Sequence, residues 1–288
     1  MDFAHLHVHS VGSILDGYCK LDKLREKAES LNHPAIAITD HGNIFMAYKF
    51  WKEFKNSKVK PILGQEFYIV KGSRKEKESR EMYHLVLLAK NAEGWKNLCR
   101  LSSIAFTEGF YYKPRIDHEV LVRYNKGLIC MSACLAGEVA QDILAGKNED
   151  AEQDIAFLQE LFQDDFYIEV MPHDSDDQRK VNTYLARYVE WGNLVATNDA
   201  HYIEAEDEPY HSFLLKIQTA SSGKQGLQFS IKDLFVKTRA QMKESFLRYH
   251  PSMGEASIEQ ALDNTLKIVE KIEPMKFDAS HKVPVYGG

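Results

Sequence analysis

Short apolar runs alternate with helix-patterned stretches along most of the chain. The runs have the length of β-strands and cover residues 3–8, 35–39, 61–69, 83–89, 127–132, 166–171 and 194–197. Between most of them, the spacing of polar and apolar positions predicts helices over 21–31, 44–54, 92–103, 152–162 and 177–191. Continuous apolar runs such as 35–39 are typical of strands buried in a parallel sheet. Strands and helices that alternate about seven times predict an α/β fold, a distorted TIM-like (βα)7 barrel.

Two segments interrupt this alternation. Residues 71–80 (KGSRKEKESR) are a charged insert and residues 223–230 are rich in Gly, Ser and Gln, so both are expected to be solvated loops. A strand-like stretch at 234–237 and a long helix at 257–272 follow. Pro and Gly residues near the end of the tail indicate a linker. We therefore expect one domain over 1–275 and a tail or linker over 276–288.

Composition narrows the class of protein. With 44% hydrophobic and 27% charged residues in 288, the chain can bury a large core. The start lacks a signal sequence, no stretch is long and apolar enough to span a bilayer, and the four cysteines are sparse, so we expect a cytoplasmic protein with reduced thiols and no membrane partner. The net charge of -6 argues against a protein that coats nucleic acid. It leaves a nuclease open, because bound cations reverse the sign of a carboxylate-lined cleft.

Polar residues stand at the edges of the apolar runs. His7 and His9 are two apart on a predicted strand, so both imidazoles can face one ion. Further candidates adjoin or interrupt the runs, namely Asp16, His41, Glu66, His84, Cys134, Asp199 and His201. Most of them come at the C-terminal end of a strand, where barrel enzymes carry their functional groups, whereas His84 comes at a strand's start. Polar groups in such runs are costly unless they have partners, so the pattern predicts a shared site.

These residues lie within motifs of a known family. The motifs are HLHVHS (5–10), LDG (15–17), AITDHGN (37–43), GQEFY (64–68), YHLVLLAKN (83–91), GFYYKPRID (109–117), SACLAGE (132–138), VATNDAHY (195–202) and ALDNTLKIVEK (261–271). Through them the chain resembles the PHP (polymerase and histidinol phosphatase) domain at the N-terminus of bacterial DNA polymerase III α subunits. The resemblance covers nearly the whole chain, and it implies that 1–275 is a PHP phosphoesterase domain.

The resemblance also implies a site for three divalent ions. One ion would be held by His7, His9, Glu66 and Asp199, a second by Glu66, His84 and Cys134, and a third by Asp16, His41 and His201. Imidazole and carboxylate ligands favour Zn²⁺, Mn²⁺ or Fe²⁺ over Mg²⁺ or Ca²⁺, and the thiolate shifts the balance slightly toward Zn²⁺ or Fe²⁺. Glu66, Asp199 and His201 are expected to act in catalysis through metal-bound water, with hydroxide as the nucleophile.

Other residues are candidates for substrate contact. Lys113 and Arg115 are placed to grip a phosphate, their alternative being an ordinary solvated loop, and His173 is a candidate near the cleft. The remaining histidines are expected to be structural or exposed, and these are His33, His118, His211, His250 and His281, with His5 in a supporting or core role.

Three functions follow from these expectations. The first is a metal-dependent phosphoesterase, specifically a 3′→5′ exonuclease with DNA 3′ ends or nucleotides as substrate and a replicative polymerase as a further partner. The second is a phosphomonoesterase acting on a small metabolite or nucleotide. The third is a metal-stabilised docking module of a replicative polymerase. Polymerisation by this chain is not expected, because no carboxylate-bearing polymerase domain fits after residue 275.

Overall fold

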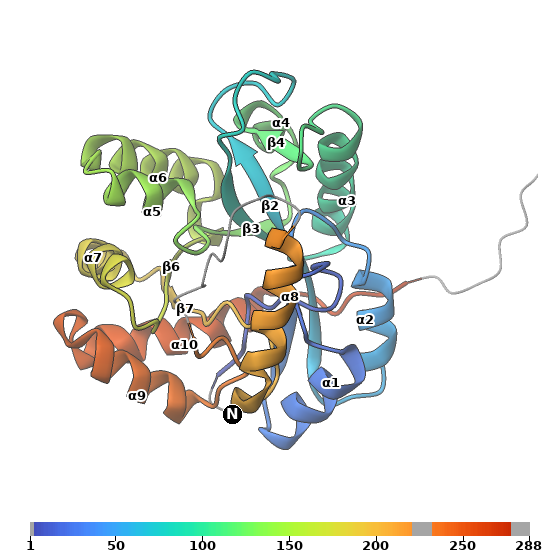
Figure 1. Ribbon diagram of the computed structural model, residues 1–288, viewed down its shortest axis with the longest axis vertical. Helices are drawn as coiled ribbons and strands as arrows, with labels where there is room; N and C mark the ends of the chain where they lie inside the picture. Colours follow the sequence, from blue (N-terminus) through green and yellow to red (C-terminus); the bar gives the residue numbers. More distant parts are fainter. Residues whose placement is uncertain (1–2, 221–231, 278–288) are drawn as a thin grey trace, which may run out of the picture.

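The strands form one curled sheet with helices around it (Figure 1). The computed structural model describes residues 3–220 and 232–277. The strands are β1 (Ala35–Ile38), β2 (Lys60–Val70), β3 (Tyr83–Ala89), β4 (Arg115–Asp117), β5 (Leu128–Met131), β6 (Phe166–Val170) and β7 (Leu194–Ala196). Their order is β1-β2-β3-β5-β6-β7, and the short β4 pairs with the far end of β2. Six of the seven predicted runs are therefore strands within a few residues of their expected bounds, whereas the run 3–8 forms only isolated bridges.

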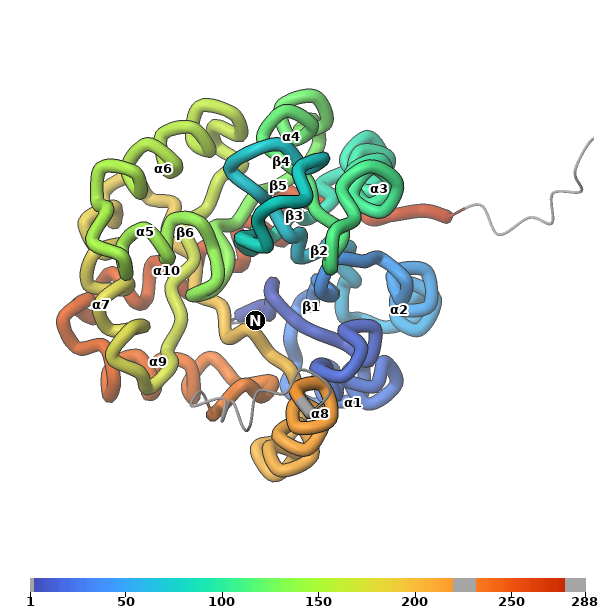
Figure 2. The backbone as a smooth tube through the Cα atoms, turned by 45° about the horizontal axis from the view of Figure 1, so that its top comes forward, coloured from blue at the N-terminus to red at the C-terminus, as the bar shows by residue number. Residues whose placement is uncertain are grey.

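The N-terminal segment closes this sheet into a barrel. On one side, Ala37 N–H donates to the His5 carbonyl at 2.8 Å, and on the other, His9 N–H donates to the Ala200 carbonyl at 2.8 Å. The segment thus lies between β1 and the chain that follows β7, although it pairs through isolated bridges rather than as a continuous strand. Figure 2 shows the helices arranged around the strands. The expected distorted barrel is confirmed.

The expectation of a fully parallel sheet is wrong at β3. This strand runs antiparallel to both β2 and β5. The reason lies in the connection, since residues 71–82 contain no helix that could carry the chain back for a parallel crossover. The start of β3 consequently lies at the same mouth of the barrel as the ends of its parallel neighbours. His84, the exception in the sequence pattern, is placed there by this reversal.

Ten α-helices accompany the strands within the described residues. They are α1 (Leu21–Ser30), α2 (Ala47–Phe54), α3 (Ala92–Thr107), α4 (His118–Tyr124), α5 (Glu138–Leu144), α6 (Asn148–Phe162), α7 (Asp176–Leu185), α8 (Glu208–Ala220), α9 (Arg239–Tyr249) and α10 (Glu255–Lys271). Four 3₁₀ helices are η1 (Gln163–Asp165), η2 (Ala186–Trp191), η3 (Ala205–Asp207) and η4 (Pro251–Met253). The helix predicted over 177–191 is therefore α7 followed by η2. Helices α4, α5, α8 and α9 had no predicted counterpart.

Capping side chains fix where several helices begin. Asn91 accepts from the Gly94 amide at the start of α3, and Ser175 accepts from the Gln178 amide at the start of α7. Thr238 begins α9 with a reciprocal capping box. Such caps satisfy amides that have no partner within the helix and stabilise it by about 1 kcal/mol each. They make the ends of these helices a local property of the sequence.

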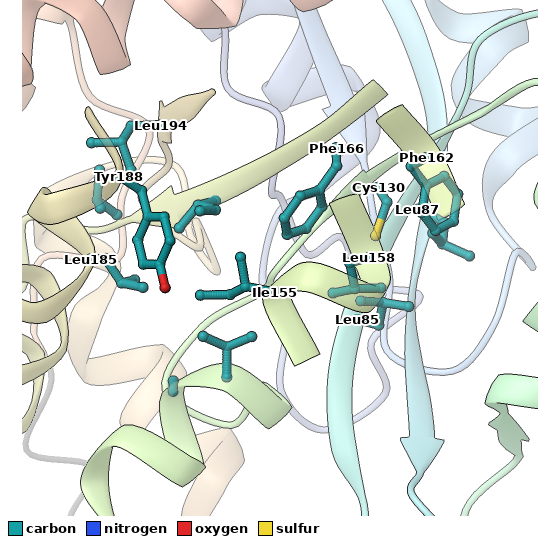
Figure 3. Close-up of a cluster of buried hydrophobic side chains, with 14 of the residues drawn as sticks. Leu85, Leu87, Cys130, Ile155, Leu158, Phe162, Phe166, Leu185, Tyr188 and Leu194 are labelled. Atoms are coloured by element: carbon teal, nitrogen blue, oxygen red, sulfur yellow. The ribbon is translucent and has the colours of Figure 1, made fainter. Parts of the chain in front are cut away.

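Alternate side chains of each strand enter different cores. Leu85 and Leu87 of β3 point outward and pack with helix residues such as Ile155 and Phe162 of α6 (Figure 3). Their neighbours Val86 and Leu88 belong to another cluster, which collects residues from β1, β2, β5, β6 and β7. Because one face of each of these strands contributes residues to this cluster, the cluster is the interior of the barrel. The barrel is therefore a packed scaffold whose mouth can carry a site.

The charged insert and the start of the tail both pack against the barrel. Residues 71–80 form a loop, but it is not simply solvated, because the buried Arg74 pairs with Asp117 at 3.0 Å and with Glu108 at 2.6 Å. In the tail, the Trp51 indole donates to the Met275 carbonyl at 2.9 Å, and the Phe277 ring packs against Trp51 at a centroid distance of 5.0 Å. Packing on the barrel thus continues past the expected boundary at 275. Residues 223–230 and 278–288 lie outside the described residues.

Candidate metal centre

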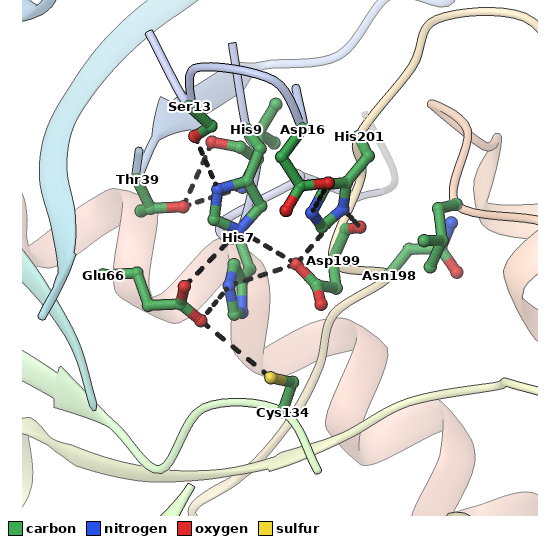
Figure 4. A network of polar contacts seen from close by, with 12 residues as sticks. His7, His9, Ser13, Asp16, Thr39, Glu66, Cys134, Asn198, Asp199 and His201 are labelled. Atoms are coloured by element: carbon green, nitrogen blue, oxygen red, sulfur yellow. Dashed lines mark hydrogen bonds and ion pairs between the residues drawn. The ribbon is translucent and has the colours of Figure 1, made fainter. Parts of the chain in front are cut away.

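The nine predicted ligands meet at one mouth of the barrel, and Figure 4 labels all of them except His41 and His84. They come from the N-terminal segment (His7, His9, Asp16), from β2 (Glu66) and β3 (His84), and from the loops after β1 (His41), β5 (Cys134) and β7 (Asp199, His201). Ends of neighbouring strands lie close together, so residues up to 194 positions apart in sequence become neighbours in space. The structure brings the whole predicted set into one cluster.

The first predicted group surrounds Glu66 and Asp199. His7 Nε2 lies 3.1 Å from Glu66 Oε1 and 3.3 Å from Asp199 Oδ1. His9 Nε2 lies 3.0 Å from Asp199 Oδ1. Asp199 adopts a left-handed backbone conformation with φ of +47°. Apart from Gly, this conformation is adopted mainly by Asn, Asp and His, and here it directs the Asp199 carboxylate toward two imidazoles.

A chain of hydrogen bonds fixes the tautomer of His9. The Ser13 hydroxyl donates to Asp40 Oδ1 at 2.8 Å, so its oxygen is left to accept from His9 Nδ1–H at 3.0 Å. With its proton on Nδ1, His9 presents a lone pair at Nε2. Burial and the neighbouring His41 and His201 lower the pKa of His9 to about 3, so the ring is neutral.

This arrangement fits a cation. His9 Nε2 and Asp199 Oδ1 are buried, and neither has a hydrogen-bond partner among the described residues, although they lie 3.0 Å apart. Two lone-pair atoms at this distance repel one another unless a positive charge lies between them. Ligands on a tetrahedral ion with bonds of about 2.0–2.1 Å are spaced by about 3.3 Å. The residues present therefore fit a divalent cation.

The second and third predicted groups adjoin the first. His84 Nδ1 lies 2.9 Å from Glu66 Oε1, and Cys134 Sγ lies 3.6 Å from His84 Nδ1. On the other side, Asp16 Oδ2 lies 3.1 Å from His41 Nε2, and Asp16 Oδ1 lies 3.6 Å from His201 Nε2. His41 joins the groups, because its Nδ1 also contacts Glu66 Oε2. Glu66 is thus central to the network, as expected for a carboxylate shared by ions.

The charges within the cluster balance one another. Burial by itself lowers the pKa of His41, but the Glu66 and Asp16 carboxylates outweigh it and raise that pKa to about 10. The pKa of His7 is likewise raised well above its ordinary value, with Asp199 and Glu169 overcoming the effect of burial. Burial would raise the pKa of Glu66, yet His84 and His41 hold it well below its usual range. Protons on imidazoles thus neutralise the carboxylates where cations would otherwise do so.

Supporting residues hold the predicted ligands in place. Glu169 of β6 accepts from His7 Nδ1–H at 3.0 Å and from the Thr197 hydroxyl at 2.6 Å. Asp40 accepts from the Ser10 and Ser13 hydroxyls at 2.7 and 2.8 Å. Partners of this kind orient metal-binding imidazoles and tune their basicity. Glu169 was missed, although a carboxylate within the apolar run 166–171 is the same signal that marked Glu66.

His211 lies at the cluster. The sequence places it among the structural or exposed histidines, and the structure buries it on α8. Its Nε2 lies 3.1 Å from Asp16 Oδ1, so it could hold Asp16 or join His201 and Asp16 around an ion. The ring of His211 packs 5.2 Å from that of His201. The inward face of α8 therefore contributes a polar side chain to the site.

A cleft of about 460 Å³ opens above the cluster. Lys113 and His173, two of the three residues expected to contact substrate, line this cleft together with Asp16, His41 and His84. Lys113 is exposed, with Nζ 5.3 Å above the Tyr68 ring, so it can reach a ligand. His173 is buried, and its Nε2–H donates to the Asn198 carbonyl at 3.1 Å.

Arg115 does not line the cleft, and its expected grip on a phosphate is wrong. The side chain is only 2% exposed. Its guanidinium donates to the carbonyls of Gly109 at 3.1 Å, Arg74 at 3.0 Å and Glu76 at 2.5 Å. These hydrogen bonds hold the loop 71–80 against β4, so the Arg115 guanidinium is not available to bind a ligand. Arg115 is therefore a structural residue.

Comparison with known proteins places the chain in a family. A family model described as the PHP domain matches residues 5–173. The chain belongs to the PHP domain family. Curated relatives are DNA polymerase III α subunits, including those of Borreliella burgdorferi (42% identical, covering 95% of this chain and 24% of the relative) and Deinococcus radiodurans (40%, 93% and 21%). This PHP chain spans about a quarter of the length of these relatives.

Solved structures resemble this PHP chain more distantly. A two-domain protein from Bacteroides vulgatus, described as containing a predicted PHP-like metal-dependent phosphoesterase, aligns with a TM-score of 0.40 and 15% identity over 69% of this chain and 52% of that one. An amidohydrolase from Chromobacterium violaceum aligns with a TM-score of 0.40 and 15% identity, covering 69% of this chain and 87% of that one.

No helix within residues 3–220 and 232–277 has the length and apolarity to cross a membrane.

Proposed function

We propose that this PHP chain is a metal-dependent phosphoesterase that acts as a 3′→5′ exonuclease on DNA ends. The observation that carries the proposal is the convergence of nine donor side chains beneath a cleft of about 460 Å³. The match to DNA polymerase III α subunits supports DNA as the substrate and a replicative polymerase as the partner. The four cysteines, all free, agree with a cytosolic location.

The proposed site holds three ions, Zn²⁺, Mn²⁺ or Fe²⁺. His7, His9, Glu66 and Asp199 would hold the first, Glu66, His84 and Cys134 the second, and Asp16, His41 and His201 the third. When bound, such ions acidify water and neutralise the charge of a phosphate ester. Among them, Glu66, Asp199 and His201 are the proposed catalytic ligands.

The chain's own residues position the substrate. Lys113, exposed at the cleft, would bind a phosphate as a point charge. His173 forms part of the cleft wall, and its bond to the Asn198 carbonyl positions the residue before Asp199. The neutral His9, held by Ser13 and Asp40, keeps one lone pair directed at the cluster without a change of protonation. The rigid barrel thus presents a fixed set of donors to the cleft.

A direct assay tests the proposal. The full chain is incubated with 3′-labelled single-stranded DNA and Mn²⁺, Zn²⁺ or Fe²⁺, and release of labelled mononucleotides is followed with time. We expect release that stops when a chelator is added. No release with any of the three ions would reject the exonuclease. Strong preference for a chromogenic monoester over a diester would instead favour a phosphomonoesterase.

A docking module is the second candidate, favoured by the relatives being polymerase subunits about four times longer than this chain. In that case the cations would stabilise the barrel without hydrolysis. The two functions separate in one experiment, in which thermal melting and DNA hydrolysis are measured on the same metal-loaded sample. Loss of stability on chelation with no ester cleaved beforehand would support docking alone.

A further inference from the structure

One wall of the cleft is apolar and aromatic. Ile14, Phe106 and Pro114 line the same cavity as the proposed ligands His41 and His84. Ile14 is 70% exposed and Phe106 is 39% exposed, so both offer apolar surface to whatever enters. The cleft therefore combines charged and imidazole groups at its floor with apolar groups at its side. A ligand that carries a phosphate next to a flat apolar group would use both surfaces.

The aromatic surface continues from the cleft across the barrel's rim. The ring of Phe106, near the end of α3, lies 5.8 Å from that of Phe45 and 6.2 Å from that of Phe110. Phe45 is 61% exposed and Phe110 is 51% exposed. Three adjacent phenylalanine rings in contact with water are unfavourable in a lone domain, and a contiguous exposed apolar patch marks a binding surface. Its continuity with the cleft connects it to the substrate.

We propose that Ile14, Phe45, Phe106 and Phe110 form a base-binding wall that stacks the unpaired bases of a single strand whose 3′ end enters the cleft. The inference rests on the proposed function and adds a nucleotide subsite to it. Bases stack on aromatic rings with little dependence on sequence, and a stacked base strengthens binding by about tenfold. In a duplex both faces of a base are covered, so the wall selects single strands. Lys113, exposed at the same cleft, would meet the backbone phosphate.

The base-binding wall also separates the candidate substrates. A small polar metabolite phosphate would occupy the floor of the cleft and leave the three rings unused. A single strand uses the floor through its terminal phosphodiester and the rings through the preceding bases. A protein surface is the competing occupant of an exposed apolar patch, and the experiment distinguishes it because it predicts no dependence on bases.

Binding of two oligonucleotides tests the wall. One is a fluorescent single strand with normal bases and phosphorothioate linkages at its 3′ end, which resist hydrolysis. The other has the same backbone with abasic sites at the terminal positions. Anisotropy titrations with the metal-loaded full chain should give at least about tenfold tighter binding of the strand with bases. Phe106→Ala should reduce that preference at least threefold while leaving affinity for the abasic strand unchanged.

Controls separate stacking from folding. Phe106→Leu keeps an apolar side chain without a ring, so it should lose the preference as Phe106→Ala does, at an unchanged melting temperature. Trp191→Ala removes another exposed aromatic ring, 51% exposed and not part of the cleft lining, and should behave as wild type. Two results would reject base binding at this surface and point to a protein occupant. One is equal affinity of the wild type for both strands, and the other is a preference for bases that Phe106→Ala leaves intact.

Failure of the base-binding wall and failure of the proposed exonuclease give different results. Base-dependent binding without nucleotide release from an unmodified strand would reject the exonuclease while supporting the wall. Release of nucleotides at equal rates from strands with and without penultimate bases would support the exonuclease and reject the base-binding wall.

Discussion

His9 Nε2 and Asp199 Oδ1 lie 3.0 Å apart, and both are buried without a hydrogen bond among the described residues. The proton of His9 is held on Nδ1 by Ser13, so two lone pairs face one another. Without a bound cation, the protonated His7, whose Nε2 lies 3.3 Å from Asp199 Oδ1, offsets the charge of Asp199. A cation between His9 Nε2 and Asp199 Oδ1 would use both lone pairs directly, so this pair is the feature that most directly indicates metal binding.

The first prediction concerns Asp199. Asp199→Asn keeps the shape of the side chain but removes its charge, so we expect metal affinity and phosphoesterase turnover to fall by about 100-fold or more. The protein should stay folded, because the substitution also relieves the facing lone pairs. Metal titration, turnover and circular dichroism check these outcomes. Asp174→Asn, at an exposed aspartate paired with Arg179, is the matched control and should change none of them. Full turnover in Asp199→Asn would exclude its catalytic role.

The second prediction concerns protons. With a pKa of about 10, His41 is protonated in the metal-free protein at neutral pH, and His7 shifts in the same direction. A cation binds the neutral imidazole, so metal binding must release protons. Apparent affinity should rise with pH up to about pH 10, by as much as tenfold per unit for each proton released. Calorimetric titrations at pH 7 in two buffers of different ionisation enthalpy measure that release. Identical heats in both buffers would contradict the protonated cluster.

The third prediction concerns His211. His211→Ala leaves Asp16 without its 3.1 Å partner, so we expect metal affinity to fall by about 10–100-fold. His211→Gln places an amide N–H within similar reach of Asp16 and should restore most of the affinity. His118→Gln, which alters an imidazole paired with Glu138 at 3.0 Å, is the control. If Gln and Ala were equally harmful, His211 would bind the ion itself rather than orient Asp16.

The fourth prediction contrasts two neighbouring cations. Lys113→Ala should raise KM for DNA several-fold without a change in stability, because its side chain is exposed at the cleft. Arg115→Ala should lower the free energy of unfolding by about 3 kcal/mol, because it leaves several buried carbonyls without a donor. Urea unfolding and steady-state kinetics measure the two effects. A stable Arg115→Ala protein with raised KM would restore its expected role in phosphate binding.

The same two residues show what the sequence could and could not predict. Lys113 and Arg115 stand two apart in one polar motif, and only the folding back of residues 71–80 over β4 buries one of them. Glu66 and His41 were predictable because a polar group beside an apolar run needs a partner. His84 was identified by the family motif, but its placement required the reversal of β3.

His211 was missed for a different reason. Helix α8 has no predicted counterpart, and nothing in the spacing around 211 relates it to Asp16, which lies 195 positions earlier. The contact exists only because the loop after β7 turns α8 across the barrel mouth. Local patterns predicted the strands and their terminal residues, whereas contacts between distant loops depended on the tertiary fold.

Anomalous diffraction from crystals grown with Mn²⁺ or Zn²⁺ tests the central claim most directly. The account predicts strong peaks inside the cluster, one of them within bonding distance of both His9 Nε2 and Asp199 Oδ1, and the loss of that peak in Asp199→Asn crystals. Crystals soaked at saturating metal that showed no peak among these nine side chains would contradict it.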